Sequence, residues 1–173
     1  MEAAQAGSRR CYPDCMLEHA DRLEQTLSAA HPRLAALTEE AASARSAQGA
    51  WSKKEELGHL IDSAANNHQR FVRLQNEALL ALPGYAPDEW NRVQHYRERA
   101  WTDLIEFWMA YNRHLAHVIR HADPTRIENR WRSPKDGDLT LLFIVTDYLS
   151  HLDHHLSHIL GQHPQPAQNT APL

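Results

Sequence analysis

The chain has 173 residues, a formal net charge of -4 and an apolar fraction of 42%. This length suits one domain with a full hydrophobic core, and the composition is ordinary for a soluble globular protein. The negative charge and the lack of a dense Lys/Arg run argue against nucleic acid as the main partner. Residues 1–10 contain no apolar leader and no apolar run approaches the length of a membrane span, so we expect a cytoplasmic protein without membrane contact.

The cysteines and arginines of this sequence suggest little chemistry of their own. Cys11 and Cys15 are the only cysteines. Their spacing fits neither a disulfide scaffold nor a redox C-x-x-C motif, so we expect unpaired thiols. The region from residue 70 to residue 99 is loosely basic but interrupted by acidic residues, and a solvated helix face explains it better than a phosphate-binding patch. Its arginines are Arg70, Arg73, Arg92, Arg97 and Arg99.

Apolar periodicity predicts two helices in the first half of the chain. The pattern is helical throughout, and no stretch alternates in the manner of a strand. A first helix is expected over about 14–30, followed by a short second turn near 34–37 and an Ala/Ser-rich connector over 41–50. The second helix begins after Ser52, because Ser52-Lys53-Lys54-Glu55 has the form of a capping box. Its apolar stripe continues to about residue 82, where Pro83-Gly84 ends it.

The second half of the chain completes a predicted four-helix bundle. A loop over 85–94 precedes a third helix over about 99–121, and a polar, turn-rich segment over 124–138 precedes a fourth helix over about 139–161. We expect an all-α fold with a long connection between the second and third helices. A single domain would span 13–162, between a flexible N-terminus (1–12) and a disordered tail (163–173).

A cluster of histidines in the fourth predicted helix is the strongest sign of a site. His151 and His155 are one helical turn apart, so they project from one side of the helix and can share a metal ion. His154 points roughly opposite Leu152 and is expected to face solvent. His158 is close to His151 in angle but two turns further along.

The pattern of residues alone does not decide which side chain is the third metal ligand. His59 lies on a polar stripe of the second helix, which argues against a buried ligand unless that stripe borders a cleft. His68 lies on the apolar side of the same helix, where a histidine is more often a satisfied core residue. A di-metal site of the ferritin type is disfavoured, because Glu56-Leu57-Gly58-His59 supplies Glu-x-x-His only once and the fourth helix has no glutamate.

The order of several short motifs resembles the DinB-like superfamily of four-helix metal-binding proteins. Trp51-Ser52 opens the second helix, which continues through Gly58-His59-Leu60-Ile61-Asp62-Ser63, and the late pair is His151-x-x-x-His155. The resemblance covers roughly residues 17–160. It implies that His59, His151 and His155 hold a divalent metal ion, commonly zinc or nickel, and that His68 is structural or lines a cavity. His158 would then lie beside the site.

The resemblance also suggests what such a site does. Three neutral histidines leave a coordination position open, as catalytic sites do. Related proteins include transferases that use low-molecular-weight thiols such as bacillithiol or mycothiol. We therefore expect a metal-activated thiol that attacks a small electrophile, with Asp62 orienting a ligand histidine or accepting a proton through water. The alternatives are a metal-dependent hydrolase using bound water, and a non-catalytic, stress-associated metal-binding or dimerising module. The aromatic loop from Tyr85 to Tyr96 is compatible with a homodimer contact.

Overall fold

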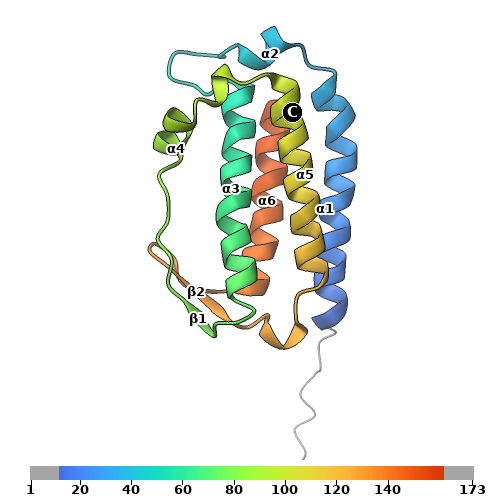
Figure 1. Cartoon of the computed structure of the whole chain (residues 1–173), viewed down its shortest axis with the longest axis vertical. Helices are drawn as coiled ribbons and strands as arrows, with labels where there is room; N and C mark the ends of the chain where they lie inside the picture. Colours follow the sequence, from blue (N-terminus) through green and yellow to red (C-terminus); the bar gives the residue numbers. More distant parts are fainter. Residues whose placement is uncertain (1–11, 162–173) are drawn as a thin grey trace, which may run out of the picture.

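The bundle consists of four long helices that run side by side (Figure 1). The computed structural model describes the backbone of residues 12–161 and the side chains of residues 15–161. The helices are α1 (Tyr12–Ala35), α3 (Lys53–Arg73), α5 (Trp101–Arg120) and α6 (Leu141–Ile159). Each long helix packs against two others, in the ring order α1, α5, α3, α6. The predicted all-α four-helix bundle is therefore confirmed.

The apolar stripes found in the sequence form the core of this bundle. One buried stripe comes from each long helix, and burial of each large side chain contributes about 1.5–3 kcal/mol. Trp108, at the centre of α5, is fully buried. Other members with at most 1% exposure include Leu23, Leu27, Leu57, Leu60, Leu104, Leu149 and Leu152.

The start of α3 follows from the predicted capping box. The backbone N–H of Ser52 donates to Glu55 Oε2 at 2.8 Å, and the Glu55 N–H donates to Ser52 Oγ at 3.3 Å. Two of the otherwise unsatisfied amide groups at the helix end are thereby paired. This cap fixes where α3 begins and hence which way its first two turns face.

The second helix ends earlier than the sequence suggested, and strands follow it. α3 stops at Arg73, and β1 (Leu79–Leu80) pairs in parallel with β2 (Arg130–Ser133), which pairs antiparallel with β3 (Gly137–Thr140). The expected helix to residue 82 and the expected absence of strands are both wrong. The alternation of buried and exposed side chains in β2 is not visible in the sequence, because the strand is only four residues long and the neighbours of the buried Trp131 are polar. The small sheet lies at one end of the bundle, beside the end of α3 (Figure 1).

Short helices occupy segments that were expected to be irregular. The connector holds α2 (Glu39–Ser43), and the predicted loop 85–94 holds α4 (Pro87–Gln94), where Pro87 suits the first turn. The 3-10 helix η1 (Tyr96–Glu98) follows, and a second, η2 (Pro124–Arg126), precedes β2. The long connection therefore runs along the outside of α3, with α4 beside its upper half (Figure 1).

Tyr96 ties this connection directly to the backbone of α3. A Cβ atom added at Gly58 would overlap the Tyr96 ring, so the ring lies on the helix backbone itself. From there the Tyr96 hydroxyl donates to Asp62 Oδ1 at 2.6 Å. The absence of a side chain at Gly58 therefore positions the connection over the second and third turns of α3.

Some of the features expected from the sequence lie outside residues 12–161. Cys11, the N-terminal segment up to residue 11 and the tail 163–173 lie outside the described residues, and the single domain over 13–162 stays a prediction. Cys15 is a half-buried free thiol. Within residues 12–161, the helices are too short or too polar to span a membrane.

Candidate metal centre

Three histidines from two helices converge between α3 and α6. Nε2 of His59 lies 3.1 Å from Nε2 of His151. The ring centroid of His155 is 4.7 Å from that of His59 and 4.5 Å from that of His151. One nitrogen from each ring lies within 4.8 Å of the other two. The residues named in the resemblance are thus brought together by two rigid elements.

Two of these rings are buried enough to stay uncharged. His59 is only 5% exposed, and His151 is half-buried. Burial is the main cause that lowers the pKa of His59 and of His151 to about 4, and the nearby His155 lowers both further. Both imidazoles are therefore neutral near pH 7, which is the form that can bind a metal ion.

His59 lies inside the molecule, although its position on a helical wheel suggested a polar, solvated stripe. The indole of Trp51 lies 5.1 Å from the His59 ring and the Tyr85 ring lies 6.3 Å from it, measured between centroids. Both residues belong to segments that flank α3 in the chain rather than to a bundle helix. The helical wheel gave the wrong environment for His59 because it considers only the packing of four helices, whereas the connecting segments cover the outer face of α3.

Glu56 holds two histidines of α6 in place. Its Oε1 atom lies 3.1 Å from Nδ1 of His155 and 3.1 Å from Nδ1 of His158. Burial opposes ionisation of Glu56, but the hydrogen bonds and charges of the two histidines prevail and lower its pKa. A carboxylate on Nδ1 leaves Nε2 of His155 free to face the other rings, the arrangement that commonly orients a metal-binding histidine. Glu56, His155 and His158 form a second group of potential ligands, which shares His155 with the first.

The donor set fits a divalent cation. Three imidazole nitrogens suit zinc or nickel, and in a tetrahedral site with bonds of about 2.0–2.1 Å two ligand nitrogens lie about 3.3 Å apart. The 3.1 Å between His59 and His151 is close to that separation. His59 Nδ1 is buried without a hydrogen-bond partner among the described residues. Its ring therefore depends on the contact at Nε2, where a cation would be held.

Asp62 lies one turn after His59 and is held by the connection rather than by a histidine. Its Oδ1 accepts hydrogen bonds from the Tyr96 hydroxyl at 2.6 Å and from Gln94 Nε2 at 2.5 Å. Oδ2 is buried without a partner in the described part of the chain, and burial raises the pKa of this carboxyl group. The expected role in orienting a ligand histidine stays a prediction, because the hydrogen bonds of Asp62 go to Tyr96 and Gln94.

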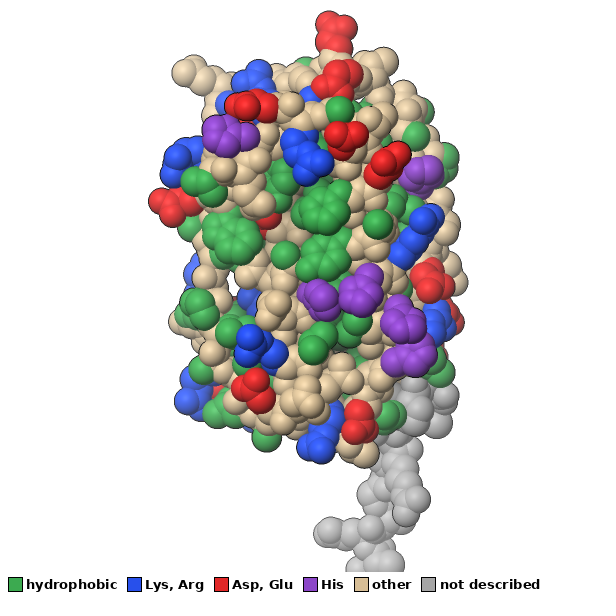
Figure 2. All heavy atoms as spheres, viewed as in Figure 1, with side chains coloured by type: hydrophobic (Ala, Val, Ile, Leu, Met, Phe, Trp, Pro, Cys, Tyr) green, Lys and Arg blue, Asp and Glu red, His purple; other side chains and the backbone are tan. Residues whose placement is uncertain are grey.

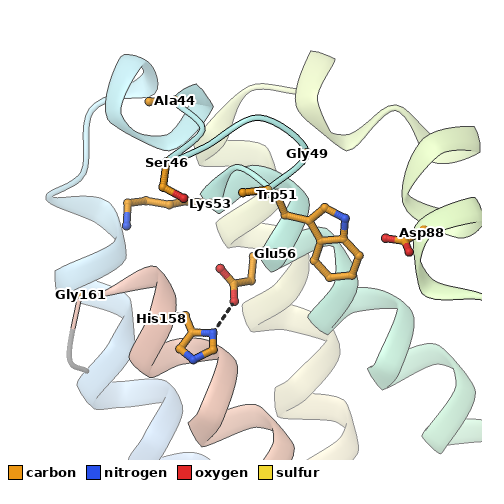
Figure 3. A pocket seen from close by; sticks show the side chains of 10 residues that line it. Ala44, Ser46, Gly49, Trp51, Lys53, Glu56, Asp88, His158 and Gly161 are labelled. Atoms are coloured by element: carbon orange, nitrogen blue, oxygen red, sulfur yellow. Dashed lines mark hydrogen bonds and ion pairs between the residues drawn. The ribbon is translucent and has the colours of Figure 1, made fainter. Parts of the chain in front are cut away.

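Two hollows lie near the metal centre, and only the smaller one is lined by one of the three histidines. A hollow of about 650 Å³ lies beside Trp51, Lys53, Glu56 and His158. Figure 3 shows the Glu56 carboxylate and the His158 ring joined by a hydrogen bond at this hollow, with the Trp51 indole on the side toward Asp88. A smaller cavity of about 170 Å³ lies along α3 and α6 and reaches His151.

The other histidines lie elsewhere. His68 is half-buried and its Nδ1 lies 3.1 Å from the Tyr111 hydroxyl, away from the metal centre and next to His114. Figure 2 shows histidines gathered on one face of the bundle, toward the end of α5, where His114, His117 and His121 are exposed. His154 is exposed as expected.

Several residues of this centre were not assigned a role from the sequence. The sequence suggests Glu56 only as part of a di-metal motif. Its i, i+3 spacing from His59 nevertheless places both side chains on one side of the helix. Arg70 was assigned to a solvated face, yet it is half-buried and lines the smaller cavity. The aromatic content of the loop from Tyr85 to Tyr96 is compatible with a lid over a cleft or with a dimer contact, and its sequence does not choose between them, because the position of Tyr85 depends on the path of the long connection.

Comparisons with known proteins match most of the chain. The family model described as the DinB superfamily matches residues 22–159. A protein of Oceanobacillus iheyensis is 26% identical over 113 residues, and one of Bacillus mycoides is 22% identical over 111 residues. Both are named as candidate metal-dependent hydrolases. Each match covers 64% of this chain and 64% of the relative, so the chain spans less than two thirds of their length.

A solved structure supports the same architecture. YfiT from Bacillus subtilis, described as a probable metal-dependent hydrolase with an unusual four-helix bundle topology, superposes with a TM-score of 0.69. The match covers 94% of this chain and 91% of YfiT at 17% sequence identity. At this level of identity, the likeness is evidence for the fold.

Proposed function

Because this chain belongs to the DinB superfamily, we propose that it is a metal-dependent enzyme in which His59, His151 and His155 hold a divalent cation. The observation that carries this proposal is the convergence of their nitrogens within 4.8 Å, next to a cavity that reaches His151. Bound there, a zinc or nickel ion would supply Lewis acidity and lower the pKa of a water or thiol ligand. The two relatives from Oceanobacillus iheyensis and Bacillus mycoides are also named as metal-dependent proteins.

The chain's own residues hold the three ligand side chains in fixed orientations. Glu56 accepts from Nδ1 of His155 and so directs Nε2 toward the other two rings. The Trp51 indole packs beside the His59 ring and helps to hold it in place. Burial, followed by the charge of Asp62, raises the pKa of Tyr85 to about 12, so its hydroxyl stays protonated and can donate a hydrogen bond into the smaller cavity.

We propose a low-molecular-weight thiol as the nucleophile and a small electrophile as its partner. The two hollows support this choice, because a transfer reaction needs room for two molecules. The smaller cavity reaches His151, and the larger hollow reaches Glu56, whose carboxylate contacts His155. In the reaction, the thiol loses its proton to solvent or a nearby base, a carbon–sulfur bond forms, and the leaving group departs with its electron pair. The hollow of about 650 Å³ beside Glu56 is large enough for a thiol cosubstrate.

Hydrolysis is the second candidate, and the names of the relatives favour it. Here a water molecule takes the place of the thiol and the smaller cavity alone holds the substrate. The residues that hold the metal are the same. The two functions therefore differ in the nucleophile and in whether the larger hollow is used.

The test compares metal-loaded and metal-free protein on two substrates. Chlorodinitrobenzene with several thiols reports thiol transfer through release of chloride, and a nitrophenyl ester without thiol reports hydrolysis. We expect a metal-dependent rate with at least one thiol, and none in a His151→Ala/His155→Ala variant. A metal-dependent rate only with the ester would assign hydrolysis. Absence of both rates in metal-loaded protein would overturn the enzymatic proposal and favour a non-catalytic metal-binding module.

A further inference from the structure

The smaller cavity contains a cation that the metal centre does not use. Arg70 lies near the end of α3, and its guanidinium carbon is 3.8 Å from the centroid of the Trp131 ring. Trp131 is buried and fixed by a hydrogen bond from Nε1 to the Leu82 carbonyl at 3.1 Å. The guanidinium is therefore stacked on a rigid aromatic wall rather than extended into solvent.

Arg70 lacks an anionic partner at close range. Its Nη1 donates to Asn67 Oδ1 at 3.0 Å, which uses one of the five N–H groups of the side chain. Within residues 15–161, the ion pairs involve other arginines, and the guanidinium has no carboxylate within ion-pair distance. Asp147 is the acidic group that lines the same cavity. It is exposed and forms no ion pair with Arg70, although its charge partly offsets the effect of burial, which lowers the pKa of the guanidinium. A half-buried guanidinium with unused donors is a ready site for an anion.

The cavity connects this cation with the metal centre. Ser63, Asn67 and Arg70 follow each other at spacings of four and three residues, so they line one side of α3 over about 10 Å. Side chains on a helix lean toward its N-terminus, which directs Arg70 back toward Asn67 and the histidines. At the other end, Ser63 Oγ lies 3.5 Å from Nδ1 of His151. A molecule in this cavity would extend from the guanidinium toward His151.

We propose that the cavity between α3 and α6 binds a small substrate through a single carboxylate group, and that Arg70 recognises this group. That the bound molecule is the substrate rests on the function proposed above. The opposite end of the molecule, near His151, would carry the group that reacts. Trp131, Ile144 and Phe143 supply the apolar wall for the atoms between the two ends.

Size and charge favour one carboxylate over a phosphate. The cavity of about 170 Å³ is close to the roughly 150 Å³ that holds a benzene ring. It offers one cation, and Asp147 adds a negative charge at its rim, so a dianion would be repelled more strongly than a monoanion. The Tyr85 hydroxyl adds a neutral hydrogen-bond donor. A monocarboxylate with a short apolar body fits these features.

The experiment uses the full chain, stripped of metal with a chelator, so that the carboxylate cannot bind a cation at the histidines. Benzoate is titrated and the indole N–H signal of Trp131 is followed by NMR, with the signal identified by its loss in Trp131→Phe. We expect saturable binding of benzoate. Benzamide, which has the same shape without the charge, should bind at least about tenfold more weakly, and phenylphosphonate should also bind more weakly.

Two variants locate the effect. Arg70→Gln should weaken benzoate binding at least about tenfold, whereas Arg73→Gln, which removes an exposed guanidinium one turn further along α3, should not change it. Benzoate binding that is equal in wild type and Arg70→Gln would overturn the proposal. Equal binding of benzoate and benzamide to the wild type would also overturn it, whether or not the variant folds. Phenylphosphonate binding as tightly as benzoate would contradict the single carboxylate.

The same titration in His59→Ala/His155→Ala separates this inference from the proposed function. Neither histidine lines the cavity, so benzoate binding should persist there. If the wild-type protein binds no metal in elemental analysis but benzoate binding depends on Arg70, the metal-dependent function fails and the carboxylate site stands. If metal binds as proposed but Arg70 has no effect on benzoate, the carboxylate site alone is wrong.

Discussion

His59 and His151 face each other through their Nε2 atoms at 3.1 Å, although 92 residues separate them in the chain. Neutral imidazoles at this distance can share one proton or bind one cation. The low pKa of both rings, caused chiefly by burial, disfavours a charged pair near pH 7. This contact therefore joins α3 and α6 at the point where His155 adds a third nitrogen.

Loss of the paired histidines on α6 should abolish metal binding. We expect His151→Ala/His155→Ala to retain no stoichiometric zinc or nickel after loading and desalting, because a single remaining histidine is a weak ligand. His154→Ala is the matched control, since that ring is exposed on the same helix and should leave the metal content unchanged. Elemental analysis of the purified proteins measures both, and full metal content in the double variant would contradict the centre.

Neutralising Glu56 should weaken metal binding without removing a ligand of the three-histidine set. In Glu56→Gln, the Nδ1 atoms of His155 and His158 lose a charged acceptor, and the expected decrease in affinity is about 10- to 100-fold. Competition with a chromophoric chelator measures the dissociation constant. Glu106→Gln, an exposed change on α5, serves as the control and should match the wild type. Equal affinities for all three proteins would show that Glu56 does not orient His155.

The four long helices could be predicted because their signals are local. The capping box at Ser52 fixed the start of α3, and the apolar stripe of α6 gave its position to within about two residues. The spacing of His151 and His155 is also local, so that pair was found from the sequence. The third histidine was not, because the wheel disfavoured His59, and only the resemblance to a known family selected it over His68.

The remaining features depend on contacts between distant segments. Trp131 lies in β2 opposite Leu80 of β1, which is 51 positions earlier in the chain, and four residues are too few for a visible alternation. The same is true of Arg70, whose stacking partner Trp131 is 61 positions away in the sequence. No local pattern distinguishes such an arginine from one on a solvated face. The cavity and its charge therefore required the structure.

Gly58→Ala should destabilise the protein, because the added methyl group would overlap the Tyr96 ring. We expect the free energy of unfolding to fall by about 1–3 kcal/mol, as overpacking usually costs. Urea denaturation measures this change. Gly84→Ala is the control, since a Cβ there meets no atom within 4 Å, and it should change stability by less than about 0.5 kcal/mol.

A second change tests whether Tyr96 is the cause. In the Tyr96→Ala background, the methyl group at Gly58 meets no ring, so Gly58→Ala should cost much less than in the wild type. The difference between the two costs is the coupling energy of the pair. If Gly58→Ala is equally destabilising with and without the Tyr96 ring, the contact does not explain the effect.

Asp62 should make the stability of the metal-free protein depend on pH in a definite direction. Burial raises the pKa of this carboxyl group in the folded state above its ordinary value of 3.8. The folded state therefore binds more protons than the unfolded state as the pH falls toward 4, and linkage requires that this group's contribution to stability increases on acidification.

Asp62→Asn keeps an oxygen that accepts from Tyr96 and Gln94 but does not titrate. The free energy of unfolding of the wild type minus that of Asp62→Asn should thus become more positive between pH 7 and pH 4, measured by urea denaturation with a chelator present. A difference that stays constant or becomes more negative would show that the buried Oδ2 atom is better solvated than the structure indicates.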